Sequence, residues 1–210
     1  MRAALGLVML GTLVHSATVN SATANVVPEV NKTAQIAFAV PRAWVIDNEQ
    51  TLTAVGFIVP PMPLYALVAS PTKTPASVAL NASAVPWLFV TVETDHDLLP
   101  APQLYELAPE YLESLASQSG NPVTAVKVLV PHRSLQEGGL TGSTAALTVV
   151  SPMGNTSLDE LAYEKGNQIW MVIAGCSSAC YDENRTTIMD IVAGVRVGSA
   201  ARGAFTAAGA

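Results

Sequence analysis

The sequence carries little charge for its length. Only 12% of its 210 residues are Asp, Glu, Lys or Arg, whereas a soluble domain typically has about 25%. The formal net charge is −6, and Lys and Arg do not cluster anywhere in the chain. A protein that binds nucleic acid needs a concentrated basic surface to meet the phosphate backbone. We therefore predict that nucleic acid is not a partner.

Long apolar runs are missing after the N-terminus, although half of all residues are hydrophobic. No later run reaches the roughly 18 residues that a membrane span needs. The N-terminus itself has Arg2, an apolar stretch over residues 3–14, and the sequence Ala-Thr-Ala at 22–24. This order matches the basic, apolar and cleavage regions of a signal peptide. We expect residues 1–24 to be removed, which leaves a secreted protein without a membrane span.

Cysteine is scarce, with Cys176 and Cys180 as the only two. A lipid anchor on an N-terminal cysteine is therefore excluded. In an exported protein, two cysteines four residues apart can reach the roughly 4.4–6.8 Å between Cα atoms that a disulfide requires. A redox-active pair is the alternative, but the spacing is not that of thioredoxin-like motifs. We predict a structural disulfide that fixes the corner between the last strand and the last helix.

The mature chain has the size of one domain, which we place at residues 25–197. Strand alternation at 35–40 puts Ile36, Phe38 and Val40 on one face, before a turn that leads to Trp44. A second strand is expected at 53–59, where a run of prolines ends it. Residues 60–84 are rich in Pro, Ala, Ser and Thr and are expected to form a long surface connection with at most short helical or strand pieces.

The second half of the sequence predicts a sheet with helices beside it. We expect a strand at 86–92, a helix with apolar positions from Leu104 to Leu115, and then consecutive strands of an antiparallel meander at 123–130, 143–150 and 157–164. A hairpin turn at 165–167 leads to an apolar strand at 168–174 that needs cover on both faces. The last helix should begin at an Asp182 N-cap and bury Ile188, Ile191, Val192 and Val195. Residues 198–210 are Gly- and Ala-rich, and we expect a disordered tail.

Sequence motifs for catalysis are absent. Residues 94–97 (Thr-Asp-His-Asp) form the only compact group of His and carboxylates, but adjacent side chains in a turn seldom point at one centre. His132 is likewise expected in a turn. The two cysteines and these two histidines lack zinc-finger spacing, and the Gly-x-Ser-x-Gly motif of serine hydrolases does not occur. We predict no catalytic, metal or cofactor-binding residues, no cofactor, and no enzyme activity.

The segment from Pro60 to Tyr65 is the best candidate for contact with a partner. Its prolines stiffen the backbone, so Met62, Leu64 and Tyr65 can be presented at a low entropic cost. The alternative is that this segment covers the sheet as a lid.

The order of these elements resembles the Mog1/PsbP-like fold, and within it the actinobacterial secreted lipoproteins of the LpqN type. The resemblance rests on residues 36–44 (Ile-Ala-Phe-Ala-Val-Pro-Arg-Ala-Trp), 87–94 with the helix that follows, and 168–197. Ala43 stands where such proteins usually have Gly before Trp, and the lipobox cysteine is missing.

The resemblance implies an α+β fold, with an antiparallel β-sheet flanked by helices as an α/β/α sandwich. It also implies a non-catalytic, monomeric interaction module of the cell envelope or the extracellular space. Its partner would be a protein or an envelope component. A carrier of a small apolar ligand or lipid is the competing hypothesis, because the aliphatic composition allows a cavity, and a hydrolase comes third.

Overall fold

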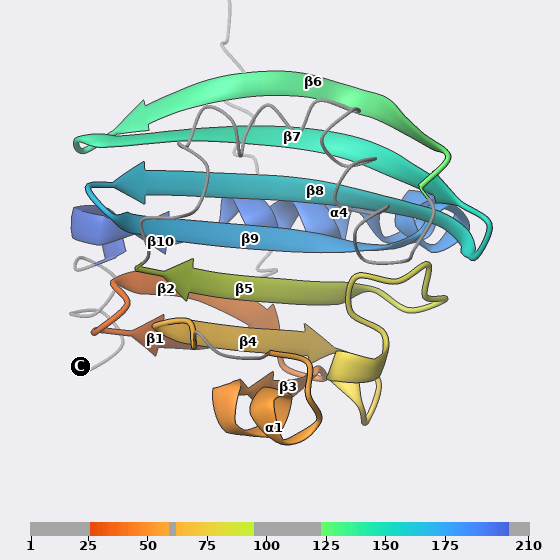
Figure 1. Cartoon of the computed structure of the whole chain (residues 1–210), viewed down its shortest axis with the longest axis horizontal. Coiled ribbons are helices and arrows are strands. Elements are labelled where there is room, and N and C mark those ends of the chain that lie inside the picture. The colour runs from red at the N-terminus through yellow and green to blue at the C-terminus, as the bar shows by residue number, and fades with distance from the viewer. Residues whose placement is uncertain (1–25, 59–61, 95–122, 202–210) are drawn as a thin grey trace, which may run out of the picture.

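The computed structural model describes residues 26–58, 62–94 and 123–201. Its largest element is a seven-stranded sheet in which all neighbours are antiparallel, with the order β3-β4-β5-β9-β8-β7-β6 (Figure 1). The strands are β3 Val45–Asn48, β4 Tyr65–Ser70, β5 Trp87–Glu93, β6 Ala125–Glu137, β7 Leu140–Ser151, β8 Gly154–Lys165 and β9 Gln168–Ser177.

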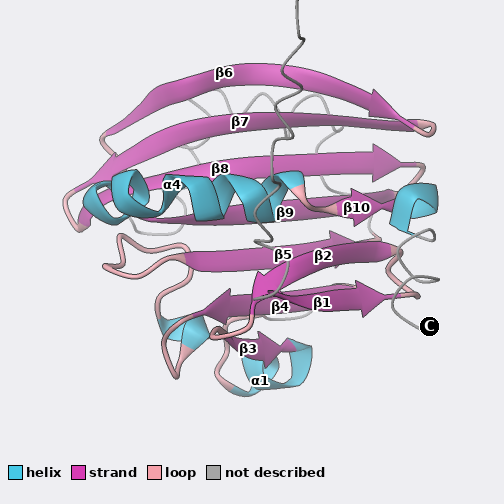
Figure 2. Ribbon diagram, turned by 180° about the vertical axis from the view of Figure 1, so that it is seen from behind, coloured by secondary structure: helices cyan, strands magenta, loops and turns pink. Residues whose placement is uncertain are grey.

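A second layer covers one face of this sheet. It consists of helix α4, Ser178–Ala193, and a three-stranded sheet of β1 Val26–Asn31, β2 Ile36–Pro41 and β10 Arg196–Val197. Figure 2 shows α4 over β8 and β9, and the small sheet over β4 and β5. The short helix α1, Glu49–Ala54, packs on the other face, where Leu52 joins Ala66 and Val68 of β4. The 3₁₀ turn η2 spans Pro75–Ser77.

The main core lies between the two layers. Alternate residues of β4, β5 and β9 point into it and meet Ile36, Phe38 and Val40 of β2 as well as the buried face of α4. Trp170 of β9 also joins the layers through a hydrogen bond, because its Nε1–H donates to the Ala34 carbonyl oxygen at 2.7 Å. The sheet and the second layer are thus held by apolar packing and by a buried polar contact.

These observations confirm the α+β fold with an antiparallel sheet. The predicted strand at 35–40, the strand at 86–92, the antiparallel meander and the hairpin before the last long strand are all present. The hairpin between β6 and β7 turns at Gly138 and Gly139, which both have positive φ, 58° and 80°. Two consecutive residues with positive φ form a tight turn whose twist matches that of the two strands it connects. The expected helix over 104–115 and the group at 95–97 lie outside the described residues.

Two predictions for the first half of the chain differ from the structure. Residues 53–58 are not a strand: α1 occupies 49–54, because the Asn48 side chain caps it by accepting a hydrogen bond from the Thr51 N–H at 3.2 Å. The region 60–84 contains the short pieces that were allowed for, strand β4 and the turn η2, but β4 is buried from Ala66 to Ser70 and does not lie on the surface. The small apolar residues of β4 lie between β3 and β5, where the small sheet covers one face of the strand and α1 covers the other.

Three details of the second half also differ from the predictions. Helix α4 is capped by Ser177 rather than Asp182, because the Ser177 Oγ accepts from the Cys180 N–H. His132 lies within β6 and not in a turn. The first residues of the predicted tail pack onto the fold: the Gly198 N–H donates to the Gln35 carbonyl, and Ala201 is fully buried. Residues 202–210 lie outside the described part.

Candidate functional site

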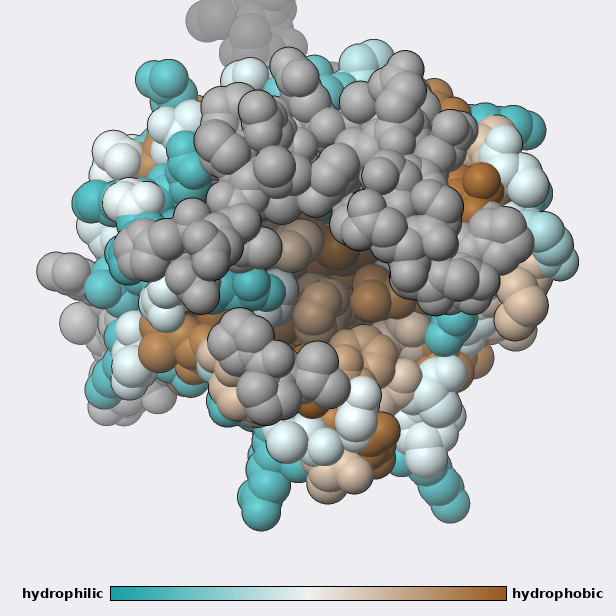
Figure 3. Space-filling model, in the orientation of Figure 1, coloured by the Kyte–Doolittle hydropathy of each residue, from teal (hydrophilic) through white to brown (hydrophobic). Residues whose placement is uncertain are grey.

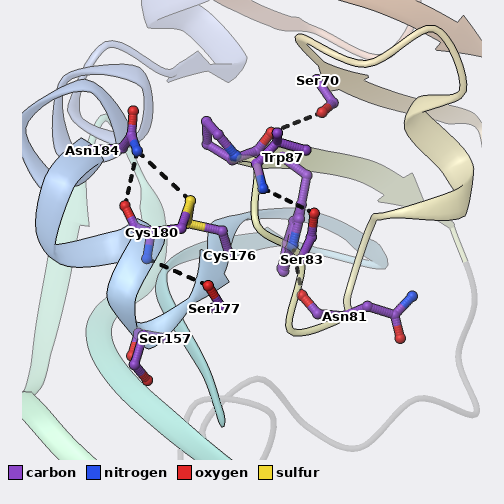
Figure 4. The surroundings of a disulfide bond; sticks show 12 residues. Ser70, Asn81, Ser83, Trp87, Ser157, Cys176, Ser177, Cys180 and Asn184 are labelled. Atoms are coloured by element: carbon purple, nitrogen blue, oxygen red, sulfur yellow. Dashed lines mark hydrogen bonds between the residues drawn. A yellow bond between two sulfur atoms is a disulfide. The ribbon is translucent and has the colours of Figure 1, made fainter. Parts of the chain in front are cut away.

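The cysteine corner is a structural element, as predicted. Cys176 at the end of β9 and Cys180 in the first turn of α4 form a disulfide with 5.9 Å between their Cα atoms. Both side chains are buried, and Figure 4 shows Asn184 beside them, where its Nδ2–H donates to the Cys180 carbonyl at 2.9 Å. A buried disulfide at a strand-helix junction restrains the direction in which the helix leaves the sheet.

The predicted contact loop is only partly exposed. The side chains of Met62 and Leu64 reach solvent, whereas Tyr65 is the first residue of β4, is half-buried and packs against the main core. The Leu64 N–H donates to the Val92 carbonyl at 2.7 Å, which fixes the loop end to β5. Burial, and the negative charge of Glu29, raise the pKa of the Tyr65 hydroxyl well above its usual value. The site role of this loop stays a prediction.

The described part of the chain offers no evident reaction centre. In residues 26–58, 62–94 and 123–201, no group of three or more His, Cys, Asp and Glu is arranged to hold a metal ion. No helix in those ranges is both long enough and apolar enough to cross a membrane. His132 is exposed on β6. The geometry therefore directs attention to surfaces that could bind.

One such surface is a groove of about 640 Å³ on the face that carries α4. It lies where the second layer ends, because α4 packs on β8 and β9 and leaves β6 and β7 uncovered (Figure 2). Ala146 and Leu161 of the sheet and Val192 of the helix form its buried apolar lining. Met189 of α4 stands at its exposed side.

Polar groups stand at the ends of this groove. At one end the Tyr163 hydroxyl donates to Glu137 Oε2 at 3.5 Å, and burial followed by the Glu137 charge raises the pKa of Tyr163, against the influence of Arg196 and Arg133. At the other end the Tyr181 hydroxyl donates to Asp159 Oδ2 at 2.9 Å. Burial raises the pKa of Asp159, and that hydrogen bond opposes the shift. The groove is thus apolar in its middle and polar at its two ends.

The second surface is strand β6, which runs along the groove. It is the last strand of the sheet, so it pairs only with β7 among the residues that the structure describes. Three consecutive large apolar side chains are exposed on it: Val128 by 58%, Leu129 by 45% and Val130 by 42%. An exposed edge strand with apolar side chains is a ready template for pairing with another chain. We define these residues as the β6 edge.

The opposite face of the sheet has an apolar floor. Figure 3 shows hydrophobic residues in a hollow at the middle of this face, and strand register places Phe89, Met171 and Ile173 on it. Glu160 of β8 shares the face, beside Ile173, and is only 6% exposed. Its carboxyl has no hydrogen-bond or ion-pair partner in the described ranges. Burial raises the pKa of Glu160 to about 7.

The sequence signals for these features are uneven. The run from Val126 to Val130 predicts a strand, but nothing in it tells that the strand ends a sheet. The groove and the burial of Glu160 depend on strand order and on the place where α4 stops. The structure also separates the two candidate contact regions, because the loop at Met62 leads into β4, five strands away from β6 in the sheet.

Searches with family models and among curated proteins find no match for this chain. Among solved structures, cyanobacterial PsbP from Synechocystis aligns with a TM-score of 0.56 at 11% identity, over 90% of this chain and all of that protein. The yeast Ran-binding protein Mog1p aligns at 0.49 and 12%, over 82% of this chain and 95% of its own. LpqN of Mycobacterium tuberculosis, which is described as involved in cell envelope biogenesis, aligns at 0.45 and 11%, over 82% and 90%.

The match to PsbP spans nearly the whole chain, and it agrees with the antiparallel sheet and its covering helix described above. At this level of identity the likeness concerns the fold. The chain has the Mog1/PsbP-like α+β fold.

Proposed function

We propose that this chain is an exported, non-catalytic module that binds a protein or an envelope component through the β6 edge. The observation that carries the proposal is the exposure of Val128, Leu129 and Val130 at the end of the sheet. Single exposed apolar residues are common on protein surfaces, but three in succession on the last described strand of a sheet combine exposed apolar side chains with an unpaired main chain, which favours contact with another chain. The fold is compatible with such a binding module.

Two features support export. The N-terminal residues have the order of a signal peptide, and the Cys176–Cys180 disulfide is the kind of bond that persists in oxidising compartments.

A capture experiment tests the β6 edge. The mature protein, with the paired change Val128→Asp and Leu129→Asp, is compared with wild type as bait in an envelope extract of its source organism. The partner identified with wild type is then purified and titrated. We expect the double change to weaken the binding of the purified partner by at least about tenfold, because two carboxylates would be buried against it without partners.

The matched control is Met153→Asp, which places a charge on the most exposed large apolar residue, 81% accessible, in the turn between β7 and β8. It should leave the partner's affinity unchanged. A further arm, with Met62→Asp and Leu64→Asp, tests the predicted contact loop. If the purified partner binds the β6-edge variant as tightly as wild type, the edge is not the contact surface, and a loss only in the loop variant would move the site to Met62 and Leu64.

The groove favours a second candidate, the carrier of a small apolar ligand or lipid. Its volume of about 640 Å³ is within the range of ligand pockets, and its lining is apolar in the middle. Native mass spectrometry of protein purified from its own host should then show a reproducible added mass that organic extraction removes. Protein that carries no added mass in that measurement would contradict the carrier hypothesis and leave the binding module.

A further inference from the structure

Strand β6 carries positive charge on both sides of the β6 edge, although the protein as a whole is acidic. From Ala125 to Arg133 the strand contains Lys127, His132 and Arg133 and no Asp or Glu, and its first acid is Glu137 at the end of the strand. The whole chain has a formal charge of −6. A local basic stretch on a surface of the opposite sign attracts acidic partners and repels copies of itself.

Strand register shows how this charge is arranged. Lys127 pairs with Thr148 of β7, and Arg133 pairs with Thr144. These partners are four positions apart on β7, so both cations lie on the same face of the sheet. Thr144 and Arg133 line the groove, and the cations therefore flank the groove side of the edge. Val130 pairs with Ala146, between them, and lines the groove as well.

The other face of β6 is uncharged. Val126 and Val128 pair with Val149 and Leu147 of β7 and so lie opposite to the cations. The side chains of an extended segment placed beside β6 would also point alternately to the groove side and to the other face. Its groove-side residues would meet Lys127, Val130 and Arg133, and its other residues would meet the valines.

A second copy of this chain is a poor occupant. Two β6 strands side by side would bring Lys127 and Arg133 near the same groups of the other copy, and like charges in cross-strand pairs destabilise a sheet. Pro131 and the register shifts between Val128 and Arg133 interrupt main-chain pairing at that point for any added strand, so it is the charge that disfavours a second copy. The edge is guarded against self-association, yet its apolar residues stay exposed.

We infer that β6 accepts an extended strand of another protein, with acidic side chains about four residues apart on the groove side and apolar side chains on the other. This inference rests on the proposed function and names the chemistry of the partner. The added strand would make main-chain hydrogen bonds to the edge, and its side chains would supply specificity, as in other cases of strand addition. The acids would pair with Lys127 and Arg133.

Synthetic peptides test this inference directly. The acidic probe is a twelve-residue peptide of Val and Thr with two Glu four positions apart, and the matched probe has Lys in place of Glu. Fluorescence anisotropy with the mature protein should give at least about tenfold tighter binding of the acidic probe at low salt, and the preference should shrink at high salt. Methylation of alternate backbone nitrogens in the acidic probe should abolish its binding, because strand pairing needs those N–H groups.

The charge-reversal variant K127E/R133E should prefer the basic probe. The control R42E/K165E makes the same change in net charge at two exposed positions outside β6, and it should keep the preference of wild type. Equal affinity for the two probes, an acidic preference that survives K127E/R133E, or binding of the methylated probe would each overturn the inference. If the probes fail while a purified partner still requires Val128 and Leu129, the partner chemistry is wrong and the proposed function stands.

Discussion

Replacing Glu160 with Gln is expected to stabilise the protein by about 3 kcal/mol at pH 8 and by less than about 1 kcal/mol at pH 5. Glu160 is 6% exposed on the face of the sheet away from α4. It lies between Ala145 of β7 and Ile173 of β9, which pair with it and offer no charge. An ionised carboxylate in such surroundings is costly, and the protonated acid is favoured.

The sign of the pH dependence follows from the pKa. Burial raises the pKa of Glu160 from the usual 4.5 to about 7 in the folded protein. The folded state therefore holds the proton more tightly than the unfolded chain does. Stability is unaffected by this group below the unfolded value, and it falls as the pH rises from about 4.5 through 7, by about 1.4 kcal/mol per pH unit. Gln removes the charge, so the variant should escape this loss.

Urea denaturation at several values between pH 5 and pH 8 measures the effect. Glu183→Gln, at an exposed position of α4, is the matched control and should change the free energy of unfolding by less than about 0.5 kcal/mol throughout. A Glu160→Gln variant whose stability differs from wild type by the same amount at pH 5 and pH 8 would show that the carboxyl does not change its protonation in this range.

Replacing Trp170 with Ala is expected to lower the free energy of unfolding by about 3–5 kcal/mol. Trp170 is almost fully buried between the seven-stranded sheet and the second layer. Truncation would leave a cavity there. It would also remove the indole N–H that donates to the Ala34 carbonyl oxygen. That oxygen would then accept a hydrogen bond only from the Gln168 Nε2–H, at 3.1 Å.

Urea unfolding of Trp170→Ala and Trp170→Phe separates packing from hydrogen bonding. The Phe variant keeps most of the apolar volume and loses the donor, so its loss should be about 1–2 kcal/mol. Met171→Ala is the control: it truncates the next residue of β9, which is half-buried on the opposite face. A loss for Trp170→Ala that is no larger than for Met171→Ala would contradict the view that this tryptophan joins the two layers.

The elements that could be predicted are those whose signal is local. Alternation at Ile36, Phe38 and Val40 reports the buried face of β2 directly. Gly166 ends β8 in a two-residue hairpin with a φ of 64°, a conformation that glycine adopts readily. The disulfide could be predicted for the same reason, because Cys176 and Cys180 are four residues apart and lie within reach at any strand-helix junction.

The errors occurred where competing local signals were close in strength. Thr53 and Ala54 belong to a run that suits a strand, but the Asn48 cap commits the chain to a helix turn. At the start of α4, Ser177 and Asp182 are both good N-caps, and the disulfide partner Cys180 already lies in the first helical turn. In both places the cap that decides the start of the helix bonds to a residue only three positions along the chain, and competing signals in the same short window obscured it.

The sequence by itself determined the antiparallel meander, the apolar face of α4 and the disulfide, because periodicity, turn residues and short spacing are properties of neighbouring positions. Only the tertiary structure decided that β6 is the last strand of the sheet in the described ranges, that α4 leaves a groove beside it and that Glu160 is buried. These three features depend on the order of the strands in the sheet and on the place where the second layer ends. Both arise from contacts between residues far apart in the chain, and the candidate site is made of such contacts.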